Sequence, residues 1–237
     1  MLSEHLTLDF DFASLTSHDT LIVTDLGGLS LLGGSFSFLN AGTADPFTGL
    51  GTFDLITFSG SLLDPNSLLS TLTASSVLNA ATGLTYAFSV TGSNTLALTI
   101  DTRLHQWQAE HFGSTAALAA QPAADPDHDG LPNLLEYALG TDPQAASSTN
   151  RPVCALVINQ ADGLPHLTLT ATLAAAAGDV SVDAEASDDL VTWHSGAPFT
   201  EVASDTTAGA VRTVVFRDTT PSGTGTRRFM RLRVTLP

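Results

Sequence analysis

The sequence predicts a mainly β protein, in which two β-rich parts are joined by a short helical segment. Three observations predict this fold class. Residues 1–102 alternate apolar with polar side chains over several short stretches, the two-residue period of strands that bury one face. Residues 103–113 and 131–139 change to the period of a helix. Residues 151–237 return to short alternating stretches separated by turn residues.

The first part, residues 1–102, contains strands of unequal length. Leu8, Phe10 and Phe12 alternate with polar residues, and the same pattern recurs over residues 84–100. Glycine pairs and Asp-Pro steps interrupt the pattern at intervals of about 7–12 residues. This spacing permits the end of a parallel β-solenoid, a sandwich or a barrel.

The middle segment, residues 103–150, contains the two predicted helices. The first spans 103–113, and its larger apolar side chains recur on one helical face. The alanine-rich stretch 114–124 is typical of a linker. The second helix spans 131–139 and is expected to end at Gly140, because glycine tolerates the left-handed conformation of a helix terminus.

The last part, residues 151–237, contains seven predicted strands. Seven short strands within one domain are typical of an immunoglobulin-like or fibronectin-like β-sandwich. The predicted strands are 153–159, 167–172, 180–186, 190–194, 199–203, 211–217 and 229–235.

Two residues of this part carry separate expectations. Trp193 is expected in the sandwich core, with a sugar-binding platform formed together with Phe199 and Phe216 as the alternative. Cys154 is the only cysteine, which excludes an intramolecular disulfide and a cysteine-rich metal site. It lies among apolar residues and is expected to be a small buried side chain.

The charge of the chain excludes several classes of partner. There are 24 acidic residues against 8 basic ones, and the formal net charge is −16. Nucleic acid and anionic membrane surfaces are therefore poor partners, because both require a basic patch. No apolar run approaches the ~20 residues of a membrane span. A strongly acidic chain is instead expected to attract cations.

Residues 125–136 read Asp-Pro-Asp-His-Asp-Gly-Leu-Pro-Asn-Leu-Leu-Glu, which fits D-x-D-x-D-G-x5-E without a gap. Calcium prefers six to eight oxygen ligands, and aspartates at alternate positions can surround one ion if the chain turns tightly. Gly130 permits that turn, and His128 is expected to point to solvent. The predicted ligands are Asp125, Asp127, Asp129, the Leu131 carbonyl, Asn133 and Glu136. The alternative is a solvated acidic turn.

The segment 125–143, which continues to Gly-Thr-Asp-Pro, closely resembles the single-loop calcium motif of thrombospondin type-three repeats and dockerins. The predicted entering helix ends near Gly113, too far from the loop for an EF-hand. The resemblance implies that Asp142 can also ligate or cap.

Four further segments extend the resemblance: His-Asp-Thr-Leu-Ile-Val-Thr from residue 18, Trp-Gln-Ala-Glu-His-Phe-Gly at 107–113, Ser-Asp-Asp-Leu-Val-Thr-Trp at 187–193 and Arg-Phe-Met-Arg-Leu-Arg-Val-Thr at 228–235. Together they resemble the C-terminal region of exported autotransporter-associated β-strand repeat proteins of Verrucomicrobia. The resemblance implies a β-helical passenger before a calcium loop and a terminal sandwich. It also implies surface display or secretion, with no established catalytic activity.

The chain also lacks the common catalytic motifs, because neither G-x-S-x-G nor H-E-x-x-H occurs. We therefore expect no enzyme, but a calcium-binding structural tail of a secreted or cell-surface bacterial protein. An upstream passenger segment would be its partner, since the first residues do not resemble a signal peptide. The alternative is an adhesin-like module that binds carbohydrate, such as a polysaccharide, or another cell-surface ligand through the sandwich.

The last predicted strand is rich in arginine. Arg227, Arg231 and Arg233 share one face by the two-residue period, which leaves the apolar side chains on the other face. This arginine face is expected either to meet water or to contact the acidic calcium segment or a neighbouring acidic surface.

Overall fold

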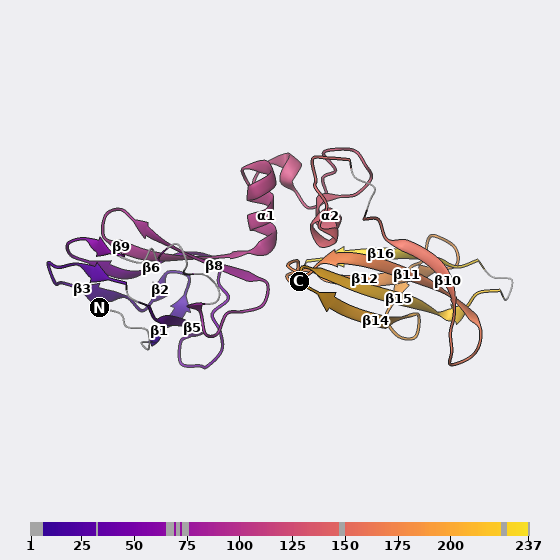
Figure 1. Ribbon diagram of the computed structural model, residues 1–237, viewed down its shortest axis with the longest axis horizontal. Helices are drawn as coiled ribbons and strands as arrows, with labels where there is room; N and C mark the ends of the chain where they lie inside the picture. Colours follow the sequence, from indigo (N-terminus) through magenta and orange to yellow (C-terminus); the bar gives the residue numbers. More distant parts are fainter. Residues whose placement is uncertain are drawn as a thin grey trace. The chain divides into compact units, whose positions relative to one another are not determined.

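The computed structural model describes residues 7–31, 33–64, 69, 72, 76–146, 150–223 and 227–236. The chain is mainly β, as predicted, and divides into two compact units, Met1–Arg103 and Leu104–Pro237 (Figure 1). Several open sheets make up the described part of the chain, and none of them closes into a barrel. The same residues contain no helix that is both long and apolar enough to cross a membrane.

The N-terminal unit combines parallel and antiparallel strand pairs. Three pairs are parallel: β1 with β5, β3 with β6, and β4 with β7. Strand β9 then pairs antiparallel with both β6 and β8. The strands are β1 Thr7–Ser14, β2 Ser17–His18, β3 Leu21–Val23, β4 Leu29–Ser30, β5 Ser35–Asn40, β6 Gly51–Phe58, β7 Leu62–Leu63, β8 Leu84–Thr91 and β9 Thr95–Thr102.

Aromatic side chains fill the core of the N-terminal unit. The alternation predicted for the first strand is confirmed, because Phe10 and Phe12 are buried whereas Thr7 and Ser14 are exposed. Phe12 stacks on Phe47 with ring centroids 4.2 Å apart. Phenylalanines separated in sequence therefore form one continuous hydrophobic cluster.

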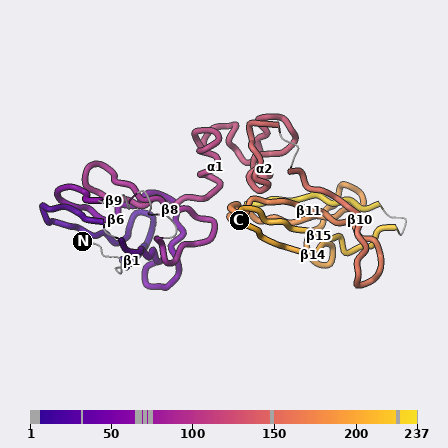
Figure 2. The backbone as a smooth tube through the Cα atoms, viewed as in Figure 1, coloured from indigo at the N-terminus to yellow at the C-terminus, as the bar shows by residue number. Residues whose placement is uncertain are grey.

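The C-terminal unit contains two sheets and two helices. Its sheets have the strand orders β10-β11-β15-β14 and β13-β12-β16, and several of these strands can be followed in Figure 2. Both sheets contribute side chains to one core. The elements are α1 Arg103–Phe112, η3 Leu118–Ala120, α2 Asn133–Leu139, β10 Val153–Ile158, β11 Pro165–Ala174, β12 Ser181–Ser187, β13 His194–Ser195, β14 Thr200–Ala208, β15 Val211–Pro221 and β16 Phe229–Thr235.

Helix α2 is part of this core. Leu131, just before the helix, and Leu139, at its end, are buried together with Leu169 and Val214 of the sheets. The helix begins two residues later than predicted and ends as predicted, since Gly140 adopts the left-handed conformation with φ of 69°. The loop before α2 and the helix itself therefore form one packing unit with the sheets.

The predicted burial of Cys154 and Trp193 is wrong. Cys154 is exposed, as is the whole of the edge strand β10. Trp193 lies outside the core cluster and is only partly buried, with the Arg231 guanidinium 4.2 Å from its ring centroid. Whether these two side chains are buried depends on the width of the opposing sheet and on the neighbouring strands. The apolar residues next to them in sequence do not determine either.

Candidate metal centre

Three aspartates form the first half of the predicted calcium site. One carboxylate oxygen from each of Asp125, Asp127 and Asp129 lies within 4.8 Å of those of the other two. The remaining carboxylate oxygens organise the loop by accepting backbone N–H groups. Asp125 Oδ2 accepts from Gly130 at 3.1 Å, and Asp129 Oδ1 accepts from Leu131 at 2.8 Å.

The loop turns where the sequence predicts a glycine to be required. Gly130 has φ of 88°, in the left-handed region that favours glycine. Residue His128 also has a positive φ, of 59°, and its side chain is exposed, as predicted. Asp127 Oδ1 accepts the Asp129 N–H at 3.1 Å and so closes a turn around His128. The chain consequently folds back tightly enough for the three carboxylates to meet.

Helix α2 contributes the second half of the site. Asn133 and Glu136 are three positions apart and share one helical face, and they are 1% and 0% exposed. The Asn133 amide donates its Nδ2 hydrogens to the Ala119 and Gln121 carbonyls at 2.7 and 2.9 Å. These two bonds fix the orientation of the amide, so that its oxygen remains for another partner.

Each of the predicted side-chain ligands has one buried oxygen without a hydrogen bond. Among the described residues, six buried side-chain nitrogen or oxygen atoms lack a hydrogen-bond partner, and five of them belong to the motif. These five are Asp125 Oδ1, Asp127 Oδ2, Asp129 Oδ2, Asn133 Oδ1 and Glu136 Oε2. Each such atom costs about 1–3 kcal/mol when it stays unsatisfied. All five are oxygens, which is the donor set of a hard cation.

The electrostatics of Glu136 also reflect this clustering. The pKa of Glu136 is raised to about 7, mainly by burial of the carboxyl; the nearby Asp127, Asp129 and Asp125 carboxylates contribute to the rise, and a hydrogen bond from Thr141 opposes it. The Thr141 hydroxyl donates to Glu136 Oε1 at 3.2 Å, so only Oε2 is left without a partner. A cation among these groups would reverse the repulsion and favour the ionised carboxylate.

The Leu131 carbonyl fits the role predicted for it. The Leu131 side chain is buried in the core, whereas no hydrogen bond between the described residues ends on its carbonyl oxygen. Asp142, by contrast, is outside the three-carboxylate cluster. Its carboxylate accepts the Gln144 N–H at 3.0 Å and lies 3.6 Å from His111 Nδ1. Asp142 therefore connects the end of α2 to α1 in this structure.

A basic residue that the sequence analysis missed contacts the loop. Arg151 Nη2 lies 3.4 Å from Asp129 Oδ2, without hydrogen-bond geometry, and donates to the Asp129 carbonyl. The arginines of β16 do not take this role, because Arg231 and Arg233 pair with Glu185 inside the sheet. The one available signal was that Arg151 is the first basic residue after the motif.

The aromatic residues of the predicted sugar platform do not form one surface. Phe216 is 3% exposed and belongs to the core, whereas Phe199 stacks on His194 with ring centroids 4.2 Å apart. One face of Trp193 is covered by Arg231. These placements give no described array of open rings on which a sugar could stack.

Comparison of the chain with protein-family models, curated proteins and solved structures found no match. The chemistry assigned to the site therefore depends on its own residues and geometry.

Proposed function

We propose that residues 125–136 bind one calcium ion, and that this ion stabilises the C-terminal unit of a non-catalytic structural protein. The observation that carries the proposal is the set of five buried oxygens without a hydrogen bond, which coincides with the five predicted side-chain ligands. With the Leu131 carbonyl they supply six oxygens, the lower end of the range that calcium takes.

The donor set favours calcium over other metals. It contains neither cysteine nor histidine, the ligands preferred by zinc and copper. Magnesium requires a compact octahedron and retains several waters, whereas calcium accepts a larger and less regular set of carboxylates and carbonyls. An affinity on the order of 10⁻⁴–10⁻³ M is expected, as in extracellular calcium modules.

The stabilising role follows from the position of α2. Asn133 and Glu136 belong to the same short helix as Leu135 and Leu139, which pack on the sheets. Without a cation, the acidic groups repel one another beside this apolar contact. With the cation bound, the loop and the helix are held against the core together.

Finer assignments of the two units belong to the same proposal. We assign the C-terminal unit to the immunoglobulin-like or fibronectin-like sandwiches, on the basis of its seven strands in two sheets around one core. We assign the N-terminal unit to the end of a parallel β-solenoid, because three successive strand pairs are parallel before an antiparallel hairpin follows. Weak calcium affinity suits a secreted or cell-surface location, and an upstream passenger would continue the solenoid.

Calcium titration of the full chain tests this function. Calorimetry is expected to show one calcium ion per chain, and magnesium is expected to bind more weakly. Calcium at a hundred times the dissociation constant should raise the free energy of unfolding of the C-terminal unit by about 2.7 kcal/mol, which chelation should reverse. A chain that neither binds calcium nor responds to chelation would contradict the proposal.

A pair of matched variants assigns the effect to the site. Asp127→Asn keeps an oxygen for the Asp129 N–H but replaces the unpartnered carboxylate oxygen with an amide, and should weaken calcium binding about 100-fold. Asp142→Asn makes the same chemical change outside the cluster and should leave calcium affinity unchanged. Equal effects of the two variants would point to general charge attraction instead of this site.

A further inference from the structure

The three-stranded sheet of the C-terminal unit ends at β16 with an open edge. Strand β16 pairs with β12 on one side, and no hydrogen bond between described backbone groups involves its other side. A strand edge of this kind presents unpaired N–H and C=O groups to a further strand.

The facing sheet extends beyond that edge. Strand β16 packs on β11, and among the described strands none packs closely on the core-facing side of β10, the next strand outward. Cys154 pairs with the core residue Leu169, which places Cys154, Leu156 and Ile158 on the core-facing side of β10. Leu156 and Ile158 are nevertheless 63% and 52% exposed. An additional strand beside β16 would cover them.

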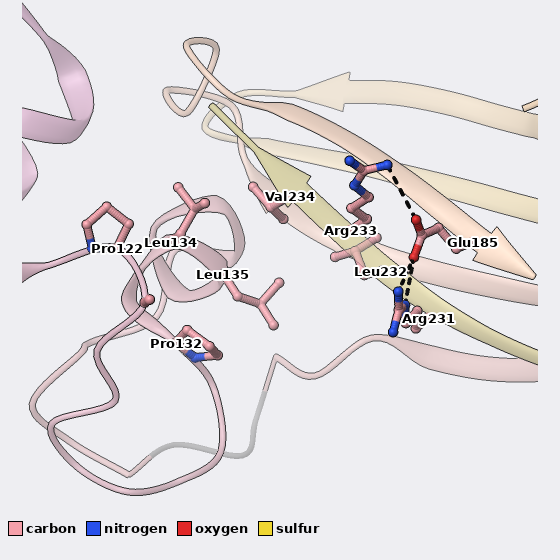
Figure 3. A pocket seen from close by; sticks show the side chains of 10 residues that line it. Pro122, Pro132, Leu134, Leu135, Glu185, Arg231, Leu232, Arg233 and Val234 are labelled. Carbon is pink, nitrogen blue, oxygen red and sulfur yellow. Dashed lines mark hydrogen bonds and ion pairs between the residues drawn. The ribbon is translucent and has the colours of Figure 1, made fainter. Parts of the chain in front are cut away.

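A pocket lies at the same edge, between α2 and β16. It has a volume of about 470 Å³. Figure 3 shows Leu134 and Leu135 of α2 on one side and Leu232 and Val234 of β16 on the other. The walls are therefore apolar where an inward side chain of an added strand would lie.

The outer rim of this pocket carries two arginines of the edge strand itself, whereas the acidic residues opposite them, Glu185 and Asp183, lie on β12, farther from the open edge. Arg231 and Arg233 share a single carboxylate, that of Glu185, at 2.6 and 3.4 Å. Both guanidinium side chains are 52% exposed, and Arg231 is additionally held over the Trp193 ring. In a chain with a net charge of −16, this is a local site for an acidic group.

We infer that the open edge of β16 is a binding site for an extended peptide strand, whose alternate side chains are apolar and acidic. The peptide backbone pairs with β16, as in β-augmentation. Its apolar side chains cover β10 and enter the pocket beside α2. Its acidic side chains face Arg231 and Arg233 on the outer surface, by the two-residue period of a strand.

The opposite end of the larger sheet supports this assignment by contrast. Edge strand β14 carries Glu201 and Asp205, which pair with arginines of β15, and its register is interrupted between Val202 and Ser204. A bulge of this kind protects an edge from further pairing. Neither β10 nor the register of β16 with β12 shows such an interruption.

A seven-residue peptide in which valine alternates with aspartate tests the inference. Binding to the full chain in excess calcium is measured by fluorescence anisotropy. The alternating peptide should bind about tenfold tighter than a peptide with lysine in place of aspartate. It should also bind about tenfold tighter than the same peptide with alternate amides methylated, because methylation removes the backbone donors while keeping the side chains. Equal binding of the three peptides would overturn the inference.

Variants locate the peptide on the protein. Arg233→Glu should weaken the aspartate peptide about tenfold and should strengthen the lysine peptide. Leu156→Asp should also weaken the aspartate peptide, whereas the matched control Val202→Asp, on the opposite edge, should not. Both of these apolar residues are exposed, so neither change is expected to unfold the unit.

Two further results would overturn the assignment to a separate peptide. If the chain dimerises with increasing concentration and the peptide dissociates the dimer, a second copy occupies the edge. If Val202→Asp weakens the peptide as strongly as Leu156→Asp, the peptide does not lie beside β10. A third result would distinguish the two proposals. If a chelator abolishes calcium binding but the peptide still binds, the peptide site does not depend on the proposed calcium function.

Discussion

The N-terminal unit is held by a phenylalanine-rich core, whereas every buried polar or charged side chain that the structure describes belongs to the C-terminal unit. The buried apolar set of the C-terminal unit includes small residues such as Ala171, Ala184 and Ala186. Burial of large aromatic side chains gives the N-terminal unit a stabilisation that does not depend on ions. The C-terminal unit instead buries several polar groups, and those of residues 125–136 include five oxygens without a hydrogen bond.

Truncation of the aromatic core gives the largest effect and is confined to the N-terminal unit. Phe38→Ala removes a ring that is 1% exposed and contacts several other phenylalanines, and should cost about 4 kcal/mol. Hydrogen exchange with mass spectrometry should then show faster exchange in residues 7–102 only. Calcium should not restore protection. Faster exchange in residues 153–235 would show that the two units unfold together.

Removal of a buried ion pair should produce the next largest effect, in the C-terminal unit. Arg228 donates to both carboxylate oxygens of the fully buried Asp218, at 2.6 and 2.8 Å. Arg228→Ala leaves that carboxylate buried and unpaired, which should cost about 3 kcal/mol. The same exchange experiment should locate the loss in β11 and β15 with or without calcium. The control Arg212→Ala breaks a more exposed pair with Asp205 and should cost under about 1 kcal/mol.

The effect of pH on calcium affinity should be smaller than the effects of the two substitutions above. Its sign should be opposite to that of the effect of pH on the stability of the metal-free unit. The pKa of Glu136 is raised to about 7, mainly by burial, so the metal-free fold favours the protonated carboxyl. The free energy of unfolding of the metal-free unit should therefore decrease as pH rises from the ordinary pKa of a glutamate, 4.5, through 7. Calcium needs the carboxylate, so affinity should fall about tenfold per pH unit below 7.

Calorimetry in buffers with different ionisation enthalpies measures the proton released. Close to one proton per calcium is expected well below pH 7, and almost none well above it. Glu136→Gln should abolish this release together with most of the affinity. Proton release that persists in this variant would assign the titration to another group.

The smallest effect should come from Arg151. Its guanidinium lies 3.4 Å from Asp129 Oδ2 and repels an incoming cation. Arg151→Gln keeps a donor for the Asp129 carbonyl and should raise calcium affinity about threefold. Calorimetry at low and high salt checks this, since the gain should shrink as salt screens the charge. A loss of affinity would instead assign Arg151 to loop organisation.

Sequence patterns predicted those elements whose structure depends mainly on residues close together in the sequence. The spacing of residues 125–136 specifies a turn and one face of a helix, so the meeting of the three aspartates could be predicted from sequence, whereas calcium binding stays a prediction. In the C-terminal unit, β16 was predicted at its observed bounds, Phe229–Thr235. Alternation within a single strand was sufficient for this element. The predicted strand 190–194 is wrong except for its last residue, because Leu190 has a positive φ of 63° and β13 spans only His194–Ser195.

The other errors concern contacts between distant segments. Val153–Ile158 was correctly predicted as a strand, but the exposure of Cys154 depends on which strands lie opposite. Trp193 is covered by an arginine 38 positions later, and Arg151 reaches back 22 positions to Asp129. A one-dimensional pattern contains neither strand order nor side-chain reach, so these neighbours could not be inferred.

The parallel pairs of the N-terminal unit have unequal spacing along the chain. Thr7 pairs with Ser35, Leu21 with Ile56 and Leu29 with Leu62, which are separations of 28, 35 and 33 residues. Much of the extra length lies in the loop between β5 and β6, which anchors itself by burying Phe47. Chain length can therefore differ between the two sets of paired strands without disturbing their parallel pairing, because the additional residues lie in a loop that carries its own buried anchor.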